Sequence, residues 1–224
     1  MSKGDTFEND FLKLVYQGVA IANLADNAVT GPLASIFYAL HSADPGEAGT
    51  QSTNEVAYTG YARVGVARSA GGHTVTGNAV SPVAAVTFGA CTAGAVTATF
   101  FSTGVAVSGL TKILHKGPIG SALGPFTATA LDVVTLPGLS GVALDDRIAF
   151  FASPASTLPG GIVEGTVYWV KTVSGNDVTL SATQGGVTLD ITSAGDGTAF
   201  RVTPLAIAPL VTPSLTTATT ITED

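Results

Sequence analysis

ASIFYALHSADPGEAG, residues 34–49, is the stretch in which the chain changes from a helical to a β pattern. It opens with a compact apolar run that carries the aromatic pair Phe37–Tyr38, which is typical of a buried strand. The run is followed at once by Pro45–Gly46, a pair that marks a turn. We therefore expect a strand that ends in a tight turn, and β structure from here onward.

The same stretch contains three side chains that could bind a metal or transfer protons, namely His41, Asp44 and Glu47. On a helix, this spacing would bring them to one face. Pro45 argues against that helix because it disfavours α geometry at the residue before it, and on a strand His41 and Asp44 would point to opposite faces. We interpret Asp44 as a turn residue whose carboxylate accepts backbone N–H groups, and we predict no metal site here.

Residues 1–30 are predicted to form an N-terminal helical segment. Asp5 can cap a helix, with Glu8 three residues later in a capping-box arrangement. Apolar side chains then recur at helical spacing and make one stripe along the helix. We predict that this stripe is an assembly contact with copies of the chain or with another protein, formed by Phe7, Phe11, Leu14 and Val15.

The rest of the chain is predicted to form antiparallel β structure in two domains. Short strands, turns about every eight to twelve residues and abundant Thr, Val and Gly favour a β-sandwich over residues 31–116 and 204–224. A Gly- and Pro-rich stretch begins at Gly117, and the hairpin VKTVSGNDVTLSA, residues 170–182, lies beyond it. We therefore expect a small β-barrel domain over residues 117–203 and a mainly β fold class with one N-terminal helix.

The composition is unusually poor in charge. Charged residues make up 11% of the 224 residues, less than half of the usual share of about 25%, and the net charge is −7. Such a surface favours burial between subunits, so we expect a homo-oligomer; the alternative is a monomer with an Ala- and Thr-rich face. No segment has the roughly 18 consecutive apolar residues of a membrane-spanning helix. The scattered Lys and Arg residues argue against nucleic acid, which requires clustered positive charge.

The sequence gives no sign of catalysis. Cys91 lies among small apolar residues and is expected to be buried and unreactive. The three histidines share no metal-binding motif, and the neighbouring carboxylates Asp145 and Asp146 would point apart on a strand. We predict no catalytic residue, no metal ion and no cofactor. Trp169 and the hairpin tip Asn176–Asp177 are predicted to form an outward-facing surface, since exposed aromatic rings often stack on ligands.

Three stretches resemble small virion proteins of tailed bacteriophages that are usually labelled tail-fibre proteins. They are GDTFENDFLKLVYQGVAIANLADNA at residues 4–28, the run from FYALHSADPG through YTGYARV at 37–83, and TPSLTTATTITED at 212–224. The resemblance covers roughly residues 4–116 and 209–224, and it implies a helix followed by a β-sandwich, with no known catalytic residues. The segment at about 117–208 interrupts this pattern and resembles small β-domains that recur as insertions in phage structural proteins.

The resemblance implies a non-enzymatic structural protein displayed on a bacteriophage virion, first of all a component of a tail fibre or similar appendage. A capsid decoration protein that stabilises the head is the alternative, and a virion-associated enzyme that cleaves carbohydrate is a third hypothesis. The expected partners are copies of the chain, as a trimer by analogy, then a tail protein or the major capsid protein, and a glycan of the host surface. We expect assembly in the host bacterial cytoplasm, final location in the virion and no membrane insertion.

Overall fold

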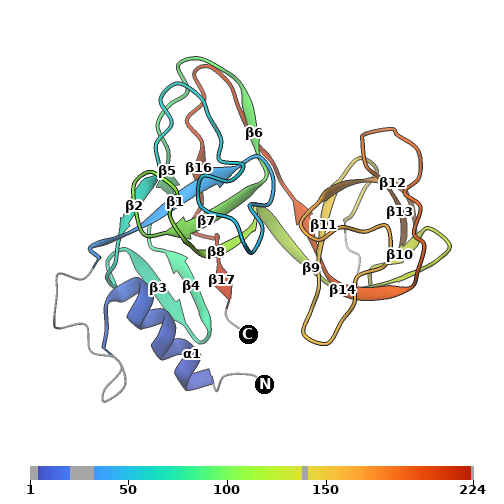
Figure 1. Ribbon diagram of the computed structural model, residues 1–224, viewed down its shortest axis with the longest axis horizontal. Coiled ribbons are helices and arrows are strands. Elements are labelled where there is room, and N and C mark those ends of the chain that lie inside the picture. Colours follow the sequence, from blue (N-terminus) through green and yellow to red (C-terminus); the bar gives the residue numbers. More distant parts are fainter. Residues whose placement is uncertain (1–4, 21–32, 138–140, 223–224) are drawn as a thin grey trace. The chain divides into compact units, whose positions relative to one another are not determined.

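The computed structural model describes residues 5–20, 33–137 and 141–222 and divides the chain into two compact units (Figure 1). The first unit comprises Met1–Gly117 and Ala206–Asp224, and the second comprises Pro118–Leu205. Both units are built from antiparallel β structure, and the first also carries the N-terminal helix. The chain thus leaves the first unit once and returns to it for its final segment.

Helix α1 (Asp5–Leu12) continues into a π-helical turn at Lys13–Gln17. It ends at Gly18, whose φ of 71° is a left-handed conformation that a residue without a Cβ adopts without strain. Leu12 and Tyr16, one turn apart, are both 0% exposed. These two side chains anchor the helical segment in the first unit.

The apolar stripe expected from the sequence is therefore not the side of the helix that is fully buried. Phe11, Leu14 and Val15 are only half-buried, while the inward side is formed by Leu12 and Tyr16. The helix has apolar side chains on more than one side, and Leu12 and Tyr16 form the side that packs within the first unit. The side chain of Phe7 and residues 21–30 of the expected helical segment lie outside the described residues. Whether the half-buried side chains form an assembly contact stays a prediction.

The first unit is organised around a four-stranded sheet in the order β2-β1-β7-β8. Its strands are β2 (Val64–Ala67), β1 (Ser35–His41), β7 (Phe100–Gly104) and β8 (Ile113–Pro118). The apolar run of the sequence forms β1, in which Ile36, Tyr38 and Leu40 are at most 1% exposed. A hairpin of β3 (His73–Thr76) and β4 (Ala79–Pro82) lies in a separate sheet.

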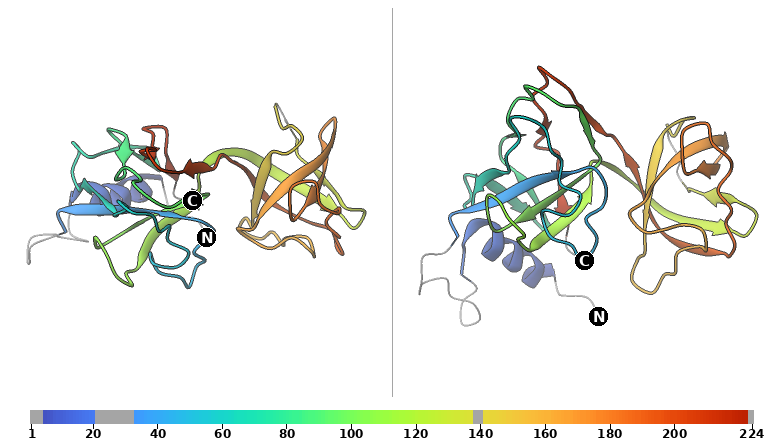
Figure 2. Two further views of the ribbon diagram at one scale, coloured as in Figure 1. Left: turned by 90° about the horizontal axis from the view of Figure 1, so that it is seen from above. Right: turned by 45° about the horizontal axis from the view of Figure 1, so that its top comes forward.

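The final segment of the chain completes three small sheets of the first unit. Its strands β15 (Leu205–Ile207), β16 (Ser214–Leu215) and β17 (Ile221–Thr222) pair with β6 (Val96–Ala98), β5 (Val86–Thr87) and β4, respectively. Between β15 and β16, the N–H of Leu210 donates to the oxygen of Cys91 at 2.9 Å. The segment 210–222 therefore runs antiparallel to residues 79–91 in one register (Figure 2).

The second unit is a closed six-stranded antiparallel barrel in the order β10-β13-β12-β11-β14-β9. Its strands are β9 (Gly120–Thr129), β10 (Val133–Thr135), β11 (Arg147–Phe151), β12 (Val167–Ser174), β13 (Asp177–Ser181) and β14 (Gly195–Val202). The rings of Phe126 and Phe150 meet edge to face in its core, with centroids 4.7 Å apart. The first and last strands, β9 and β14, pair from end to end, so the two ends of this unit lie side by side.

Because neighbouring strands of the barrel run in opposite directions, the chain enters and leaves at one end. The hairpin tip Gly175–Asn176 lies at this same end, where Arg201 Nη2 pairs with Asp146 Oδ2 at 2.9 Å. At the other end, the connecting loops are tied together, because the N–H of Ile191 donates to Asp132 Oδ1 at 2.7 Å. Hydrogen bonds at both ends thus order the loops of the barrel.

The predicted fold class is confirmed: the protein is mainly β, with a short N-terminal helix, antiparallel sheets and a closed barrel. Two turns also occur where the sequence predicts them, at Gly77–Asn78 and at Gly175–Asn176, and each begins with a glycine of φ 60°. Within the described residues, no helix is long and apolar enough to cross a membrane.

Leu215→Ala tests how much the final segment contributes to the first unit. Leu215 is 2% exposed, so we expect the substitution to lower the free energy of unfolding by about 2 to 5 kcal/mol. Urea titration followed by circular dichroism measures the change. Thr217→Ala, at an exposed position of the same segment, is the matched control and should change stability by less than about 0.5 kcal/mol. Equal effects of the two variants on the free energy of unfolding would show that the final segment adds little to the stability of the first unit.

Candidate functional site

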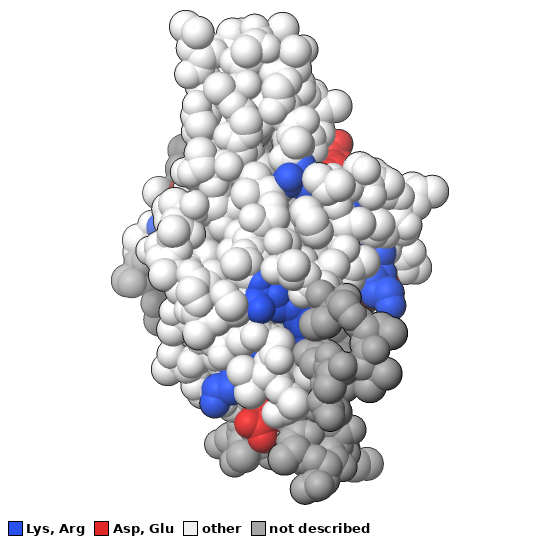
Figure 3. All heavy atoms as spheres, turned by 90° about the vertical axis from the view of Figure 1, so that its left-hand side faces the viewer, with Lys and Arg blue, Asp and Glu red and all other residues white. Residues whose placement is uncertain are grey.

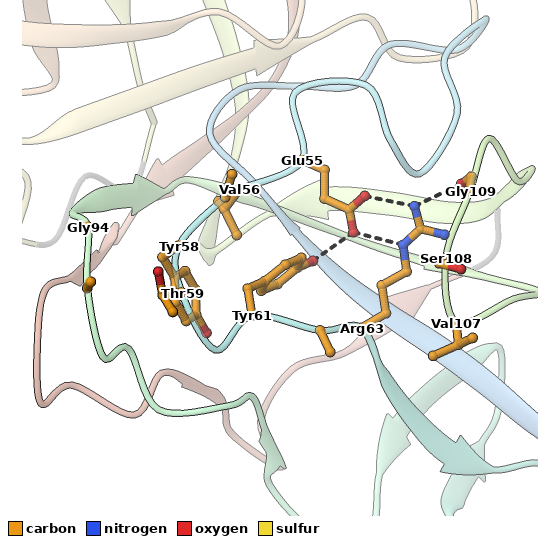
Figure 4. Close-up of a pocket in the computed structure, with 13 residues that line it drawn as sticks. Glu55, Val56, Tyr58, Thr59, Tyr61, Arg63, Gly94, Val107, Ser108 and Gly109 are labelled. Carbon is orange, nitrogen blue, oxygen red and sulfur yellow. Dashed lines mark hydrogen bonds and ion pairs between the residues drawn. The ribbon is translucent and has the colours of Figure 1, made fainter.

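An open groove of about 770 Å³ in the first unit is the candidate functional site (Figure 4). Its floor comes from the segment between β1 and β2, and its walls come from the loop before β6 and the loop after β7. Most of the lining is apolar or small, and the charged side chains are Glu55 and Arg63. The remaining lining residues are Val56, Ala57, Tyr58, Thr59, Tyr61, Ala62, Ala93, Gly94, Val107, Ser108 and Gly109.

Arg63 and Glu55 form a doubly hydrogen-bonded ion pair beneath the groove. Arg63 Nε donates to Glu55 Oε1, and Arg63 Nη2 donates to Glu55 Oε2, both at 2.8 Å. The side chains are 2% and 17% exposed, respectively. A planar guanidinium matches a carboxylate in this two-point geometry, and the two charges cancel each other inside the protein.

The other donors of Arg63 hold the loop after β7. Nη2 donates to the oxygen of Gly109 at 3.0 Å, and Nη1 donates to Thr111 Oγ1 at 3.0 Å and to the oxygen of Ala106 at 3.3 Å. One side chain thereby links the floor of the groove to one of its walls. Without strand pairing in this loop, these bonds replace a sheet in fixing its path.

Two tyrosines complete the floor. The O–H of Tyr61 donates to Glu55 Oε1 at 2.9 Å, and its oxygen accepts the N–H of Leu40 at 3.1 Å. Burial raises the pKa of Tyr61 far above its ordinary value, so the phenol stays neutral. The O–H of Tyr58 donates to the oxygen of Gly89 at 2.8 Å. The polar groups of the floor are therefore used within the protein, and the arrangement supplies a neutral, mostly apolar surface rather than an activated nucleophile or base.

The stretch around Pro45 forms the strand and turn that the sequence predicts. Asp44 Oδ1 accepts the N–H of Gly46 at 2.9 Å, which is the predicted turn role of this carboxylate. Lys116 Nζ lies 3.2 Å from Asp44 Oδ1 and 3.0 Å from Glu47 Oε1. His41 takes no part in this cluster. Among the described residues, no group of three His, Cys, Asp or Glu side chains has the geometry to hold a metal ion.

His41 and His73 are both 0% exposed and are structural. His41 Nδ1 donates to the oxygen of Thr53 at 2.8 Å, which leaves Nε2 to accept from Ser102 Oγ at 2.7 Å. His73 Nδ1 donates to the oxygen of Ala67 at 3.1 Å and Nε2 accepts from the Tyr38 hydroxyl at 3.1 Å. Burial lowers the pKa of both histidines, so both rings are neutral in the folded protein at neutral pH.

Of the residues predicted to form an outward-facing surface of the barrel, two are exposed and one is half-buried. Asn176 and Asp177 are exposed at the hairpin tip, where Thr135 Oγ1 donates to Asp177 Oδ1 at 2.6 Å. Trp169 is half-buried, and the guanidinium carbon of Arg147 lies 4.2 Å from the centre of its ring. The role of these residues as a contact surface stays a prediction.

The groove was not anticipated from the sequence. Arg63 lies in the alternating run YARVGV, where a charged residue is expected to face solvent, yet it is 5% exposed. Its partner Glu55 precedes this run and carries no motif of its own. Only a general rule could have pointed to this pair, namely that a charged side chain is buried only when an opposite charge pairs with it.

Glu55→Gln tests the buried ion pair. The amide keeps the shape of the side chain but removes the charge that balances Arg63, so we expect a loss of about 3 to 5 kcal/mol in the free energy of unfolding. Glu47→Gln is the matched control, because Glu47 also pairs with a cation but is 90% exposed, and its loss should stay below about 1 kcal/mol. Chemical denaturation of both variants gives the comparison, and a smaller loss for Glu55→Gln would contradict this account.

The buried histidines make the stability of the fold depend on pH. Their pKa values are lowered in the folded state, so below about pH 6.5 the unfolded chain binds more protons than the folded chain. The stability that the two neutral rings contribute to the fold is complete above that pH and is lost as the pH falls. We expect the urea midpoint to decrease between pH 7.5 and pH 5, and His73→Gln to show a shallower decrease. A flat profile for the native chain would refute the assignment of neutral rings.

Comparison with known proteins identifies the first unit. The family model described as podophage GP4 fiber I protein gp80 matches residues 4–116, which carry the helix, all but the end of the four-stranded sheet and the whole groove. No curated protein matches the chain. The matched family is one of phage fibre proteins, which implies a structural protein of the virion that associates with other virion components. The chain belongs to the family of podophage GP4 fiber I protein gp80.

Proposed function

We propose that this chain is a non-enzymatic structural component of a phage tail fibre or similar appendage. The observation that carries the proposal is the match to a phage fibre family over half of the chain. The chemistry of the groove supports it, because Glu55, Arg63 and Tyr61 are bound to one another and hold loops in place. The low charge of the chain supports it as well, and the face in Figure 3 is largely uncharged over its upper part.

We propose further that the barrel is an insertion in the first domain. In this proposal residues 1–30 are the N-terminal segment, 31–116 and 204–224 the base domain, and 117–203 the inserted barrel. The strands that follow the barrel pair with residues inside the family match, and β9 pairs with β14 at the point where the chain enters and leaves the barrel. Insertion at a surface turn requires such adjacent ends.

The contacts of the proposed appendage are assigned to the side chains that the sequence singles out. The N-terminal helix would bind copies of the chain, as a homo-oligomer, or a tail protein through Phe7, Phe11, Leu14 and Val15. The barrel would turn Trp169, Asn176 and Asp177 outward, toward a glycan of the host surface. Aromatic rings beside polar side chains are suited to sugars because a ring face takes C–H groups while neighbouring amides and carboxylates take hydroxyls.

The number of copies in a purified particle tests the proposed location. A tail-fibre component should be present in a small number of copies, as measured by quantitative mass spectrometry against the major capsid protein. Hundreds of copies per particle would contradict the fibre proposal and favour decoration of the capsid. Labelling the chain and imaging the particles then shows directly whether the label lies on the tail.

Deleting the barrel tests the proposed insertion. Replacing residues 119–203 by Asn-Gly joins Pro118 to Pro204 through a two-residue hairpin turn, because the N–H of Thr203 already donates to the oxygen of Ile119 at 2.7 Å. We expect the remaining chain to unfold cooperatively, with its midpoint within a few degrees of that of the first unit in the full chain. Loss of cooperative unfolding would mean that the barrel is an integral part of the fold.

A further inference from the structure

The turn Ala208–Val211 displays a leucine in a conformation that leucine disfavours. The N–H of Val211 donates to the oxygen of Ala208 at 3.0 Å, which closes the turn, and Leu210 occupies its third position with φ 74°. This is the geometry of a type II turn, in which the third position is normally Gly or Asn. The other residues with positive φ in the described part of the chain, glycines aside, are Asn54, Asp132, Asp145 and Ala155. Leu210 is the one large apolar side chain among them.

The backbone of Leu210 is bound to Cys91, but its side chain is 95% exposed and gains no packing that would offset this strain. The residues from Ala208 to Thr212 are all uncharged and exposed. A large apolar side chain held in a strained conformation without packing of its own points to a role outside the isolated chain. The turn is therefore a projecting apolar knob.

The groove described above has the complementary properties. Its charges cancel within the Glu55–Arg63 pair, its wall at Ala93–Gly94 is formed by small residues, and its opposite wall carries Val107, which is 57% exposed. Leu110, on the same loop as Val107, is 83% exposed. A volume of about 770 Å³ exceeds a leucine side chain several-fold, so the groove has room for the turn and not only for its tip.

We propose that the turn Ala208–Val211 of one copy of this chain docks in the groove of a second copy. The turn and the groove wall are close in the fold, because Leu210 N–H is bound to Cys91 and the wall begins at Ala93. A single chain thus presents an apolar knob and an apolar groove at one edge of the first unit. A contact of this kind joins two different surfaces, so its repetition gives a ring of identical copies if the rotation between neighbours closes and an open filament if it does not. The proposal rests on the structural role proposed above and assigns the residues of self-association.

Leu210→Gly separates this role from any role in folding. Glycine is favoured at the third position of a type II turn, so the variant should unfold at the same temperature as the native chain or at a higher one. Loss of the leucine side chain should nevertheless weaken association at least about tenfold per contact. Sedimentation equilibrium over a range of concentrations gives the mass of the native chain and of the variant, and so the strength of their association. Leu131→Gly, at an 80% exposed position in the barrel, is the control and should associate as the native chain does.

Disulfide trapping tests which surfaces meet. Chains carrying Leu210→Cys, mixed with chains carrying Val107→Cys and mildly oxidised, should give a disulfide between two different chains. Leu131→Cys in place of Leu210→Cys should give none. A native chain that is monomeric at every concentration, or a Leu210→Gly variant with unchanged association, would overturn the proposal. A monomeric chain that is still found in a few copies on the particle would overturn it while leaving the proposed tail-fibre role intact.

Discussion

The pairing of Arg63 with Glu55 holds the irregular part of the first unit together. Each charge alone would be costly to bury. Together they are tolerable because the guanidinium and the carboxylate bind each other and because Arg63 also donates to Thr111 and Gly109 in the loop after β7. The pair lies where strand pairing stops, between the end of β1 and the start of β2. The pair thereby fixes the path of irregular backbone, as the hydrogen bonds between strands fix the sheets. An apolar pair of the same volume could fill the space, but it could not bind the carbonyl oxygens of the loop after β7.

The sequence was informative where one local rule acts alone. Pro45–Gly46 determined the turn after β1, and Gly77 and Gly175 determined two hairpins, because each is a matter of backbone conformation within a few residues. It was less informative where packing decides between two local possibilities. The N-terminal helix offers apolar side chains on more than one side, and only the tertiary structure selects Leu12 and Tyr16 as the buried ones. The burial of Arg63 could not be predicted either, because its partners come from the loops 51–55 and 105–111.

The match to the family lies within the first unit of the structure, but the two divide the chain differently. The family model ends at residue 116, whereas the first unit also needs the final segment, whose Leu215 and Ile221 are buried against strands inside the match. The two strands that contain Leu215 and Ile221 are only two residues long. Their register is nevertheless unambiguous, because the hydrogen bonds of Leu210 and Phe88 continue it between them.

The position of these final strands has a consequence for synthesis on the ribosome. Strands β4 and β5 emerge early, but their partners β17 and β16 are translated only after the whole of Pro118–Leu205. At bacterial translation rates that interval lasts roughly 5 to 20 s. The older part of the chain therefore has unpaired strand edges throughout the synthesis of the barrel. Nascent copies on one messenger RNA would carry such edges close together. The shortness of β4 and β5 and the proline at the end of β4 limit the risk that these edges pair with one another.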